Sequence, residues 1–283
     1  MPPRIFSTLR RHPLLTAAAL LCFSATTIPA YQDYQLYMSY GPGGPPYNAF
    51  GWFITRFLIT PFTQEMFGAE VYQQRINQGE TTTFIHLPDG KLLPRRKGEI
   101  PVVGPHAVPQ RQINQLPNEE IKMVRISIIV YLYLNSTDAL NAVATNNSKL
   151  VKLAPSHLER HTDAMWLTDA IPLSSRIQEA VQTLGEVSHI HGTSDHSVHV
   201  VLSPADAKEV IDAGWGQRRS FSRWKPVATL TRANVNIPAT YNLVYAPRNQ
   251  EEIEVVMELV RASLRYMSGG GGGGGGGVDL LRL

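Results

Sequence analysis

Four of the nine histidines in the chain lie within eleven residues, with an aspartate among them: His189, His191, His196, His199 and Asp195. His189 and His191 are two residues apart on a predicted strand, so both imidazoles should point to one face of the sheet. Imidazole is the commonest metal ligand and titrates closest to neutral pH. The density of histidines therefore predicts a site that holds a metal ion or moves a proton.

Three interpretations of this cluster stay open on the residues alone. In the first, His189 and His191 hold a metal together with Asp195 or with a histidine of the next strand. Two histidines and a carboxylate form the facial set of non-haem iron oxygenases, which leaves positions open for oxygen and substrate. In the second, one neutral histidine is a general base and no metal is needed. In the third, the histidines are structural or exposed and carry no chemistry.

The register of the hairpin decides which histidines act together. A turn of four residues would place His191 opposite His196 and send His199 to the other face of the sheet. A turn of five residues would place His189 opposite His199, and His189, His191 and His199 would then share one face. The residues do not distinguish the two registers.

The elements around the cluster are predicted from apolar periodicity and stop signals. Apolar residues repeat at helical spacing from Ile177 to Leu184, and Gly185 is a natural stop for that helix. Two strands are expected near 186–191 and 196–202, around the turn Gly192-Thr193-Ser194-Asp195.

Capping residues place the elements that follow the hairpin. Ser203 should cap a helix that ends at Gly214. A strand is expected near 241–246, and Asn249 with Glu252 resembles a capping box at the start of the last helix. The order helix, hairpin, helix, strand, helix predicts an α+β fold in which helices pack on an antiparallel sheet.

The N-terminal half has weaker signals. Residues 31–49 are rich in Tyr, Gly and Pro and have the composition of a linker. Phe50–Phe67 is apolar and aromatic, and we favour a core helix interrupted at Pro61 over an amphipathic helix on the membrane surface. Loops with short strands are expected at 79–118, a strand at 124–134, a short helix at 137–147 and a long loop at 220–238.

The first thirty residues have the layout of a targeting or anchoring segment. Arg10 and Arg11 precede an apolar stretch from Leu14 to Ala30. A cleaved signal peptide and a retained anchor both fit this layout, and we expect the anchor. Positive charge before the apolar stretch favours a single-pass membrane protein of the endoplasmic reticulum or secretory pathway with a lumenal body. Glycosylation sequons at Asn135 and Asn146 agree with that topology.

Composition excludes several classes of function. The chain has 283 residues and a net charge of +3, and three arginines in residues 1–30 account for the excess. A body without net charge has no general electrostatic reason to bind nucleic acid, so we expect none as a partner. Cys22 is the only cysteine, which leaves the body without a disulfide, a cysteine nucleophile or a cysteine metal site.

Four segments occur in one order: Arg160-His161-Thr162-Asp163, His189-x-His191-x3-Asp195-x3-His199, Gly214-Trp215-Gly216-Gln217-Arg218 and Tyr245-Ala246-Pro247-Arg248-Asn249. On these motifs the chain resembles the fungal luciferase family of mushroom bioluminescence. The resemblance is strong from about residue 158 to 267. Weaker matches lie upstream, at Asp33-Tyr34-Gln35, Gly41-Pro42 and Gln110-Arg111-Gln112.

The resemblance implies an oxygenase that uses molecular oxygen as co-substrate. Luminous members oxidise a 3-hydroxylated styrylpyrone, a hispidin derivative, and a planar enolic small molecule is the substrate class expected here. A base that removes the enol proton would start the reaction, and a positive group would stabilise the anionic oxygen. By position in the motifs, His189, His191, His199 and Asp195 are expected to be catalytic. Substrate-binding roles are expected for Trp215, Arg218, Tyr245 and Arg248.

The same resemblance leaves the cofactor open. Either no cofactor is required, or a non-haem divalent metal such as iron is held by His189, His191 and His199. Residues 219–223 depart from the sequence that follows Gly214–Arg218 in the luminous enzyme, so light emission is not expected. The alternatives are a non-catalytic protein that binds an aromatic metabolite and a metal-dependent hydrolase that uses the histidines.

The chain divides into four parts on these grounds. Residues 1–30 are the membrane segment, and 31–157 are the linker and the N-terminal part of the body. Residues 158–267 are the luciferase-like α+β domain, and 268–283 form a glycine-rich tail that cannot pack.

Overall fold

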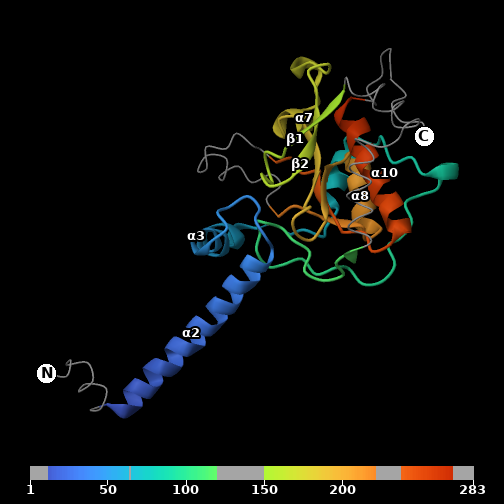
Figure 1. Cartoon of the computed structure of the whole chain (residues 1–283). Coiled ribbons are helices and arrows are strands. Elements are labelled where there is room, and N and C mark those ends of the chain that lie inside the picture. Colours follow the sequence, from blue (N-terminus) through green and yellow to red (C-terminus); the bar gives the residue numbers. More distant parts are fainter. Residues whose placement is uncertain (1–11, 64, 120–149, 221–236, 270–283) are drawn as a thin grey trace.

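The computed structural model of the chain describes residues 12–63, 65–119, 150–220 and 237–269 (Figure 1). The predicted strand at 124–134, the helix at 137–147, both sequons and most of the 220–238 loop lie outside these residues. The glycine run from Gly270 onward also lies outside them.

A six-stranded sheet forms the centre of the described body. Its strands are β1 (Val151–Pro155), β2 (Asp163–Leu167), β3 (Glu186–Ile190), β4 (Val198–Val201), β5 (Gly216–Arg218) and β6 (Tyr241–Val244). The spatial order is β1-β2-β3-β4-β6-β5, and each neighbouring pair is antiparallel. The predicted α+β fold with an antiparallel sheet is therefore confirmed.

Helices precede and cover this sheet (Figure 1). The α-helices are α2 (Pro13–Ser39), α3 (Ala49–Phe53), α4 (Glu70–Asn77), α7 (Gln178–Gln182), α8 (Pro204–Asp212) and α10 (Gln250–Met267). The π and 3-10 segments are η1 (Ile54–Ile59), η2 (Thr60–Phe62), η3 (Pro88–Gly90) and η4 (Leu173–Ser175).

The two long helices of the body begin where their capping residues predicted. The Ser203 hydroxyl accepts a hydrogen bond from the Asp206 amide at 3.1 Å and so caps α8. The Asn249 side chain accepts one from the Glu252 amide at 2.9 Å and caps α10. Each cap satisfies an amide that has no partner inside its helix.

Apolar side chains of α8 and α10 form the core against the sheet. Val198, Val200 and Val244 of the central strands pack with Val210 of α8 and with apolar residues of α10, all of them buried. α10 is also tied to the sheet by Ser263, whose hydroxyl donates to the Val187 carbonyl and accepts from the Val201 amide, each at 3.1 Å. These contacts hold β3 and β4 in place.

β1, β2 and β5 were not predicted. β1 and β2 pair along their whole length, from Val151 opposite Leu167 to Pro155 opposite Asp163. β5 has only three residues, too few for a period to be read. These strands form through pairing with distant partners, which local periodicity does not contain.

The N-terminal segment forms one apolar helix, α2, that is long enough to cross a membrane. At 1.5 Å per residue it is about 40 Å long. The helix runs through Pro29 to Ser39, so the first nine residues of the expected 31–49 linker are helical. It continues because Tyr37 is buried against the body and its hydroxyl donates to the Pro46 carbonyl at 3.2 Å.

Phe50–Phe67 is not a core helix, and that prediction is wrong. α3, η1 and η2 follow one another without a break, and their aromatic side chains are largely exposed. Gly51 and Thr55 face the body instead and are buried. Small residues permit the close approach to α2, which leaves the large side chains outside.

Asp206 is expected to stabilise the fold through its buried carboxylate. It accepts from the amides of Phe84 and Ile85 and from the Ser203 hydroxyl, and so fixes the 84–85 segment on α8. Asp206→Ala leaves these donors without an acceptor and should lower the free energy of unfolding by about 3 kcal/mol. Urea unfolding of the detergent-solubilised full chain measures this difference.

Asp212→Ala is the matched control on the same helix. Asp212 is exposed and, among the described residues, forms its ion pair with Lys208, so its removal should change stability by less than about 0.5 kcal/mol. Equal effects of the two substitutions would contradict the role assigned to Asp206.

Candidate functional site

The register of β3 and β4 brings three histidines to one face of the sheet. His189 lies directly opposite His199. The His191 amide donates to the Ser197 carbonyl at 3.0 Å, so five residues, 192–196, form the loop. This is the five-residue alternative, and His191 shares the face of the other two. His196 lies within the loop with a φ of 60° and is not a member of the cluster.

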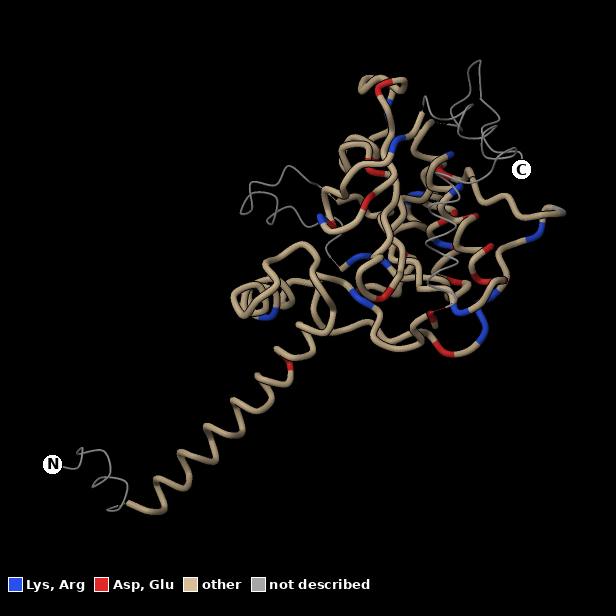
Figure 2. Tube along the Cα trace, in the orientation of Figure 1, with Lys and Arg blue, Asp and Glu red and all other residues tan. Residues whose placement is uncertain are grey.

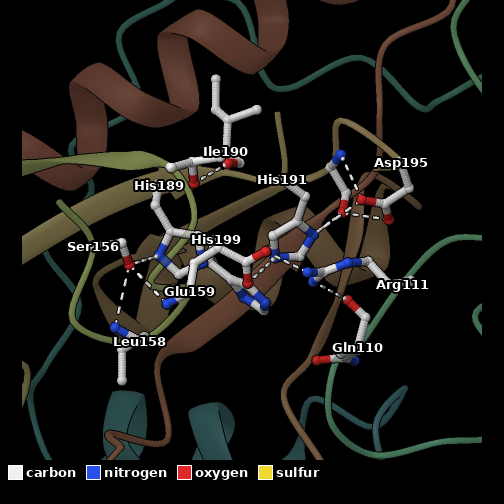
Figure 3. A network of polar contacts seen from close by, with 12 residues as sticks. Gln110, Arg111, Ser156, Leu158, Glu159, His189, Ile190, His191, Asp195 and His199 are labelled. Carbon is white, nitrogen blue, oxygen red and sulfur yellow. Dashed lines mark hydrogen bonds and ion pairs between the residues drawn. The ribbon is translucent and has the colours of Figure 1, made fainter. Parts of the chain in front are cut away.

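The three imidazoles are buried and close together (Figure 3). One ring nitrogen of each lies within 4.8 Å of the other two. His199 is central, with its ring centroid 5.1 Å from that of His189 and 4.9 Å from that of His191. Three nitrogens at such separations can bind a single metal ion.

Glu186 and Ser156 orient His189. Its Nδ1 lies 2.6 Å from Glu186 Oε1, and Glu186 also accepts from the Ser156 hydroxyl at 2.8 Å. A carboxylate accepts only, so Nδ1 carries the hydrogen and Nε2 is the basic nitrogen. Burial opposes ionisation of Glu186, but the interactions with His189, the Ser156 hydroxyl and the His157 amide together outweigh it, and the pKa of this carboxyl is lowered.

Asp195 and Ser197 orient His191 in the same way. The His191 Nδ1 lies 3.0 Å from Asp195 Oδ1 and 2.9 Å from the Ser197 hydroxyl. Asp195 also accepts from the Gln112 amide, which belongs to a distant part of the chain. Burial raises the pKa of Asp195, and Arg111 and these hydrogen bonds oppose that shift. Asp195 therefore lies behind the imidazole and positions it.

A backbone carbonyl orients His199. Its Nδ1 lies 3.2 Å from the Asn242 oxygen, and its ring stacks on Tyr241 at 4.7 Å between centroids and 14° between planes. Burial, and then the neighbouring histidines and Arg219, lower the pKa of His199 well below its ordinary value. His199 is thus a neutral imidazole with its Nε2 available to a ligand.

A buried ion pair lies beside the cluster. Glu159 Oε2 lies 3.9 Å from His191 Nε2, and Glu159 also pairs with Arg111 (Figure 3). Arg111 donates to the Pro42 carbonyl at 3.2 Å, so the segment after α2 completes the site. A Cβ at Gly43 would lie 2.3 Å from Arg111 Nη2, so a larger residue there would displace this guanidinium.

Arg219 supplies a second positive charge. Its guanidinium lies over the Tyr241 ring, 5.4 Å from the centroid, and Tyr241 is the ring that stacks on His199. Sequence reasoning named Arg218 instead. β5 ends at Arg218, and neighbouring residues of a strand point to opposite faces.

Trp215 and Tyr245 lie in the packed body. Trp215 is a member of the apolar core, and its indole donates to the Pro94 carbonyl at 2.6 Å. Tyr245 donates to Gln217 at 3.1 Å, and Arg96 lies over its ring. Contact of either residue with a substrate stays a prediction.

Arg218 and Arg248 bind acidic groups away from the three histidines. Arg218 lies 3.8 Å from Glu65, and its amide donates to the Met66 carbonyl. Arg248 pairs with Glu252 at the start of α10 and donates to the Lys97 carbonyl. Their expected roles toward an anionic oxygen also stay predictions.

Five residues of the site were not singled out for it: Arg111, Glu159, Glu186, Arg219 and Tyr241. Arg111 and Glu159 come from segments that precede the hairpin by tens of residues. The three-residue spacing of Glu186 and His189 is not a strand signal, because residues three apart on a strand point to opposite faces. Only the folded chain brings these groups together.

Comparison with known proteins gives the chain a family. A Luciferase domain model matches residues 184–263, which include all three histidines and Asp195. The luciferase of Armillaria gallica is 30% identical over 269 residues, which cover 92% of this chain and 91% of that protein. This chain belongs to the fungal luciferase family.

Other members of the family are similar over comparable lengths. The luciferase of Armillaria mellea is 30% identical and covers 94% of this chain and 92% of its own length. The luciferase of Neonothopanus nambi is 28% identical, and the alignment covers 93% of this chain and 91% of that protein. No solved structure matches the chain. The similarity extends well beyond the matched domain and includes the segments that supply Arg111 and Glu159.

His199 is expected to make stability depend on pH. The folded state lowers its pKa, so the unfolded chain takes up the proton first as pH falls below about 6.5. Stability from this residue is complete above that pH and is lost below it. Thermal unfolding between pH 7.5 and 5.5 should therefore show a shallower pH dependence in His199→Gln than in the wild type.

His161→Gln is the control for that measurement, because His161 is exposed. The unfolding temperature of this variant should depend on pH as steeply as that of the wild type. A wild-type slope in His199→Gln would show that this imidazole is not held neutral.

Proposed function

We propose that this member of the fungal luciferase family is an oxygenase that uses molecular oxygen to oxidise a planar enolic compound at His189, His191 and His199. The observation that carries the proposal is the convergence of three buried imidazoles, each with its Nδ1 bound to a separate acceptor. Imidazoles oriented in this way present basic Nε2 atoms to one point. A 3-hydroxylated styrylpyrone is the substrate class that family membership favours.

The donor set fits a divalent transition metal. Three imidazole nitrogens suit iron, zinc or copper, and the carboxylates of Glu186 and Asp195 behind two of them are the usual outer partners of metal-bound histidine. His189, His191 and His199 would hold the ion. When bound, iron would supply electron transfer between an enolate and dioxygen.

Glu159 has the position of a proton acceptor. It lies beside His191 Nε2, where an enol hydroxyl would meet the cluster. Burial raises the pKa of Glu159 above its ordinary value, and Arg111 opposes that shift. A carboxylate with a raised pKa is a stronger base, so it can take the enol proton.

Arg111 and Arg219 surround this position with positive charge. Arg111 binds Glu159, and Arg219 lies over Tyr241 on the His199 side. Charges buried in a region of low dielectric stabilise an anionic oxygen more strongly than they would in water. The two arginines would thus stabilise the enolate after it loses its proton.

We also propose that α2 is retained as a membrane anchor. It is apolar over the length of a bilayer, and none of its apolar window is buried in the protein. A body held at a membrane suits an aromatic substrate of low solubility. The relatives are named luciferases, and the proposal assigns oxygen chemistry to this chain without assigning light.

Oxygen uptake by the purified full chain with a 3-hydroxylated styrylpyrone tests the proposal. Uptake should be lost after treatment with a strong chelator and return with iron(II). His191→Ala and His199→Ala should each reduce it by about 10²–10⁴-fold. His196→Ala is the matched control, because it removes a neighbouring histidine outside the cluster and should leave uptake unchanged.

The remaining outcomes separate the alternatives. Uptake that survives chelation assigns the histidines as bases without a metal. Hydrolysis without uptake would indicate a metal-dependent hydrolase. Binding without turnover would indicate a binding protein on the same scaffold. The last two results contradict the oxygenase.

Two carboxylates near the cluster should have separable effects. Glu159→Gln keeps the size of the side chain but removes the base, so turnover should fall by about 100-fold with metal content unchanged. Glu186→Gln weakens the support of His189 and should lower metal affinity by about 10–100-fold. Metal analysis and oxygen uptake on both variants distinguish the roles, and loss of metal in Glu159→Gln would contradict the assignment.

A further inference from the structure

The segment Ala49–Phe62, here called the aromatic helix, has an inverted distribution of side chains. It comprises α3, η1 and η2. Its inward residues, Gly51 and Thr55, are small and buried, whereas Phe50, Phe53 and Phe57 are 65%, 49% and 50% exposed. A helix that faces water normally places its large apolar residues inward. An outward apolar stripe of this kind marks an interaction surface.

The polar contacts of Asp33 tie the aromatic helix to α2. Asp33 accepts a hydrogen bond from the Trp52 indole at 2.8 Å and pairs with Arg56 at 3.4 Å. A Cβ at Gly51 would lie 2.9 Å from the Tyr37 hydroxyl, so the two helices are in close contact. The position of the aromatic helix along α2 is therefore set by Asp33.

Asp33 is also where the apolar span ends. It is the first acidic residue of the chain, and no Lys, Arg, Asp or Glu lies between Arg11 and it. Figure 2 shows α2 without charge up to this point. From Pro13 the helix covers about 30 Å before it reaches Asp33, which is the thickness of a hydrocarbon core. Asp33 and the helix bound to it thus lie at the level of the lipid headgroups.

We propose that the aromatic helix lies in the surface of the bilayer that holds α2, with its phenylalanines among the upper acyl chains. The proposal rests on the anchor role of α2. Continuity with that anchor identifies the occupant of the apolar stripe as lipid. Trp52 and Arg56 have the residue types favoured at this depth, where an amphipathic ring or a cation can reach the headgroups. Such helices lie about 5–10 Å into the boundary.

This contact places the histidine site near the membrane. His106 lies 3.1 Å from Asp33, and the Ala107 amide donates to Thr60 of the aromatic helix. His106 and Ala107 lie between Val103 and Gln112, which pair as an antiparallel bridge, and Gln112 donates to Asp195 behind His191. This segment therefore links the helix that the bilayer would hold to the support of His191.

Depth measurements on the full chain test the proposal. Single cysteines carrying the fluorophore NBD are placed at Phe57 or Leu58 in a Cys22→Ser background, and the protein is reconstituted in phosphatidylcholine vesicles. Both labels should be quenched by lipids with a doxyl group near the headgroup, and iodide in the water should quench them about fivefold less than an exposed label. Leu173→Cys is the matched control, since Leu173 is 66% exposed and begins η4, the turn before α7, and α7 lies at the far end of the body from α2 (Figure 1).

A label on the native Cys22 separates failure of the anchor from failure of this proposal. In one outcome, iodide reaches the labels at positions 57 and 58 as readily as the label at position 173 while the label on Cys22 stays protected. That result would refute the contact of the aromatic helix with the membrane and leave the anchor intact. Iodide quenching of the label on Cys22 together with the labels at positions 57 and 58 would refute both the anchor and the contact of the aromatic helix with the membrane. Protection of 57 and 58 from iodide without quenching by doxyl lipids would mean that a second protein copy covers the stripe, which also overturns the proposal.

Discussion

The pairing of His189 with His199 is the constraint on which the site depends. A shift of one residue would move His199 to the opposite face and break up the cluster. Three features hold the register: Ser263 bonds to both strands, the five-residue loop closes at His191, and β4 pairs with β6 on its other side. The core between the helices and one face of the sheet thus holds the histidines in position on the other face of the same strands.

Burial of so many polar groups requires a complete network. Each imidazole has an acceptor behind it, and the carboxylates of Glu186 and Asp195 accept hydrogen bonds from both side chains and backbone. Without hydrogen-bond partners, each of these buried groups would lower the stability of the folded state, because a medium of low dielectric solvates polar groups poorly. Arg111 and Glu159 form a buried pair beside the histidines. The network orients the site and also compensates for the loss of water.

Three parts of the chain build one structure. The matched Luciferase domain covers 184–263, but the ion pair over the histidines comes from the preceding region, and the segment after α2 binds Arg111. Asp33 joins α2, the aromatic helix and His106. A chain of contacts therefore joins α2 to the histidine site, and glycine at positions 43 and 51 permits the close approach of the segments in this region.

Local chemistry determined much of the fold. Capping by Ser203 and Asn249, apolar periodicity and clustered β-branched residues were sufficient for α8, α10, β3, β4 and β6, because these signals lie within a few residues of the elements they specify. The density of histidines identified the site. Tertiary structure alone decided the hairpin register, the position of Arg219 over Tyr241, and the contributions of Arg111 and Glu159, because each depends on contact between segments far apart in the chain. It also decided that the phenylalanines at 50–62 face outward, since close packing against α2 admits only small side chains.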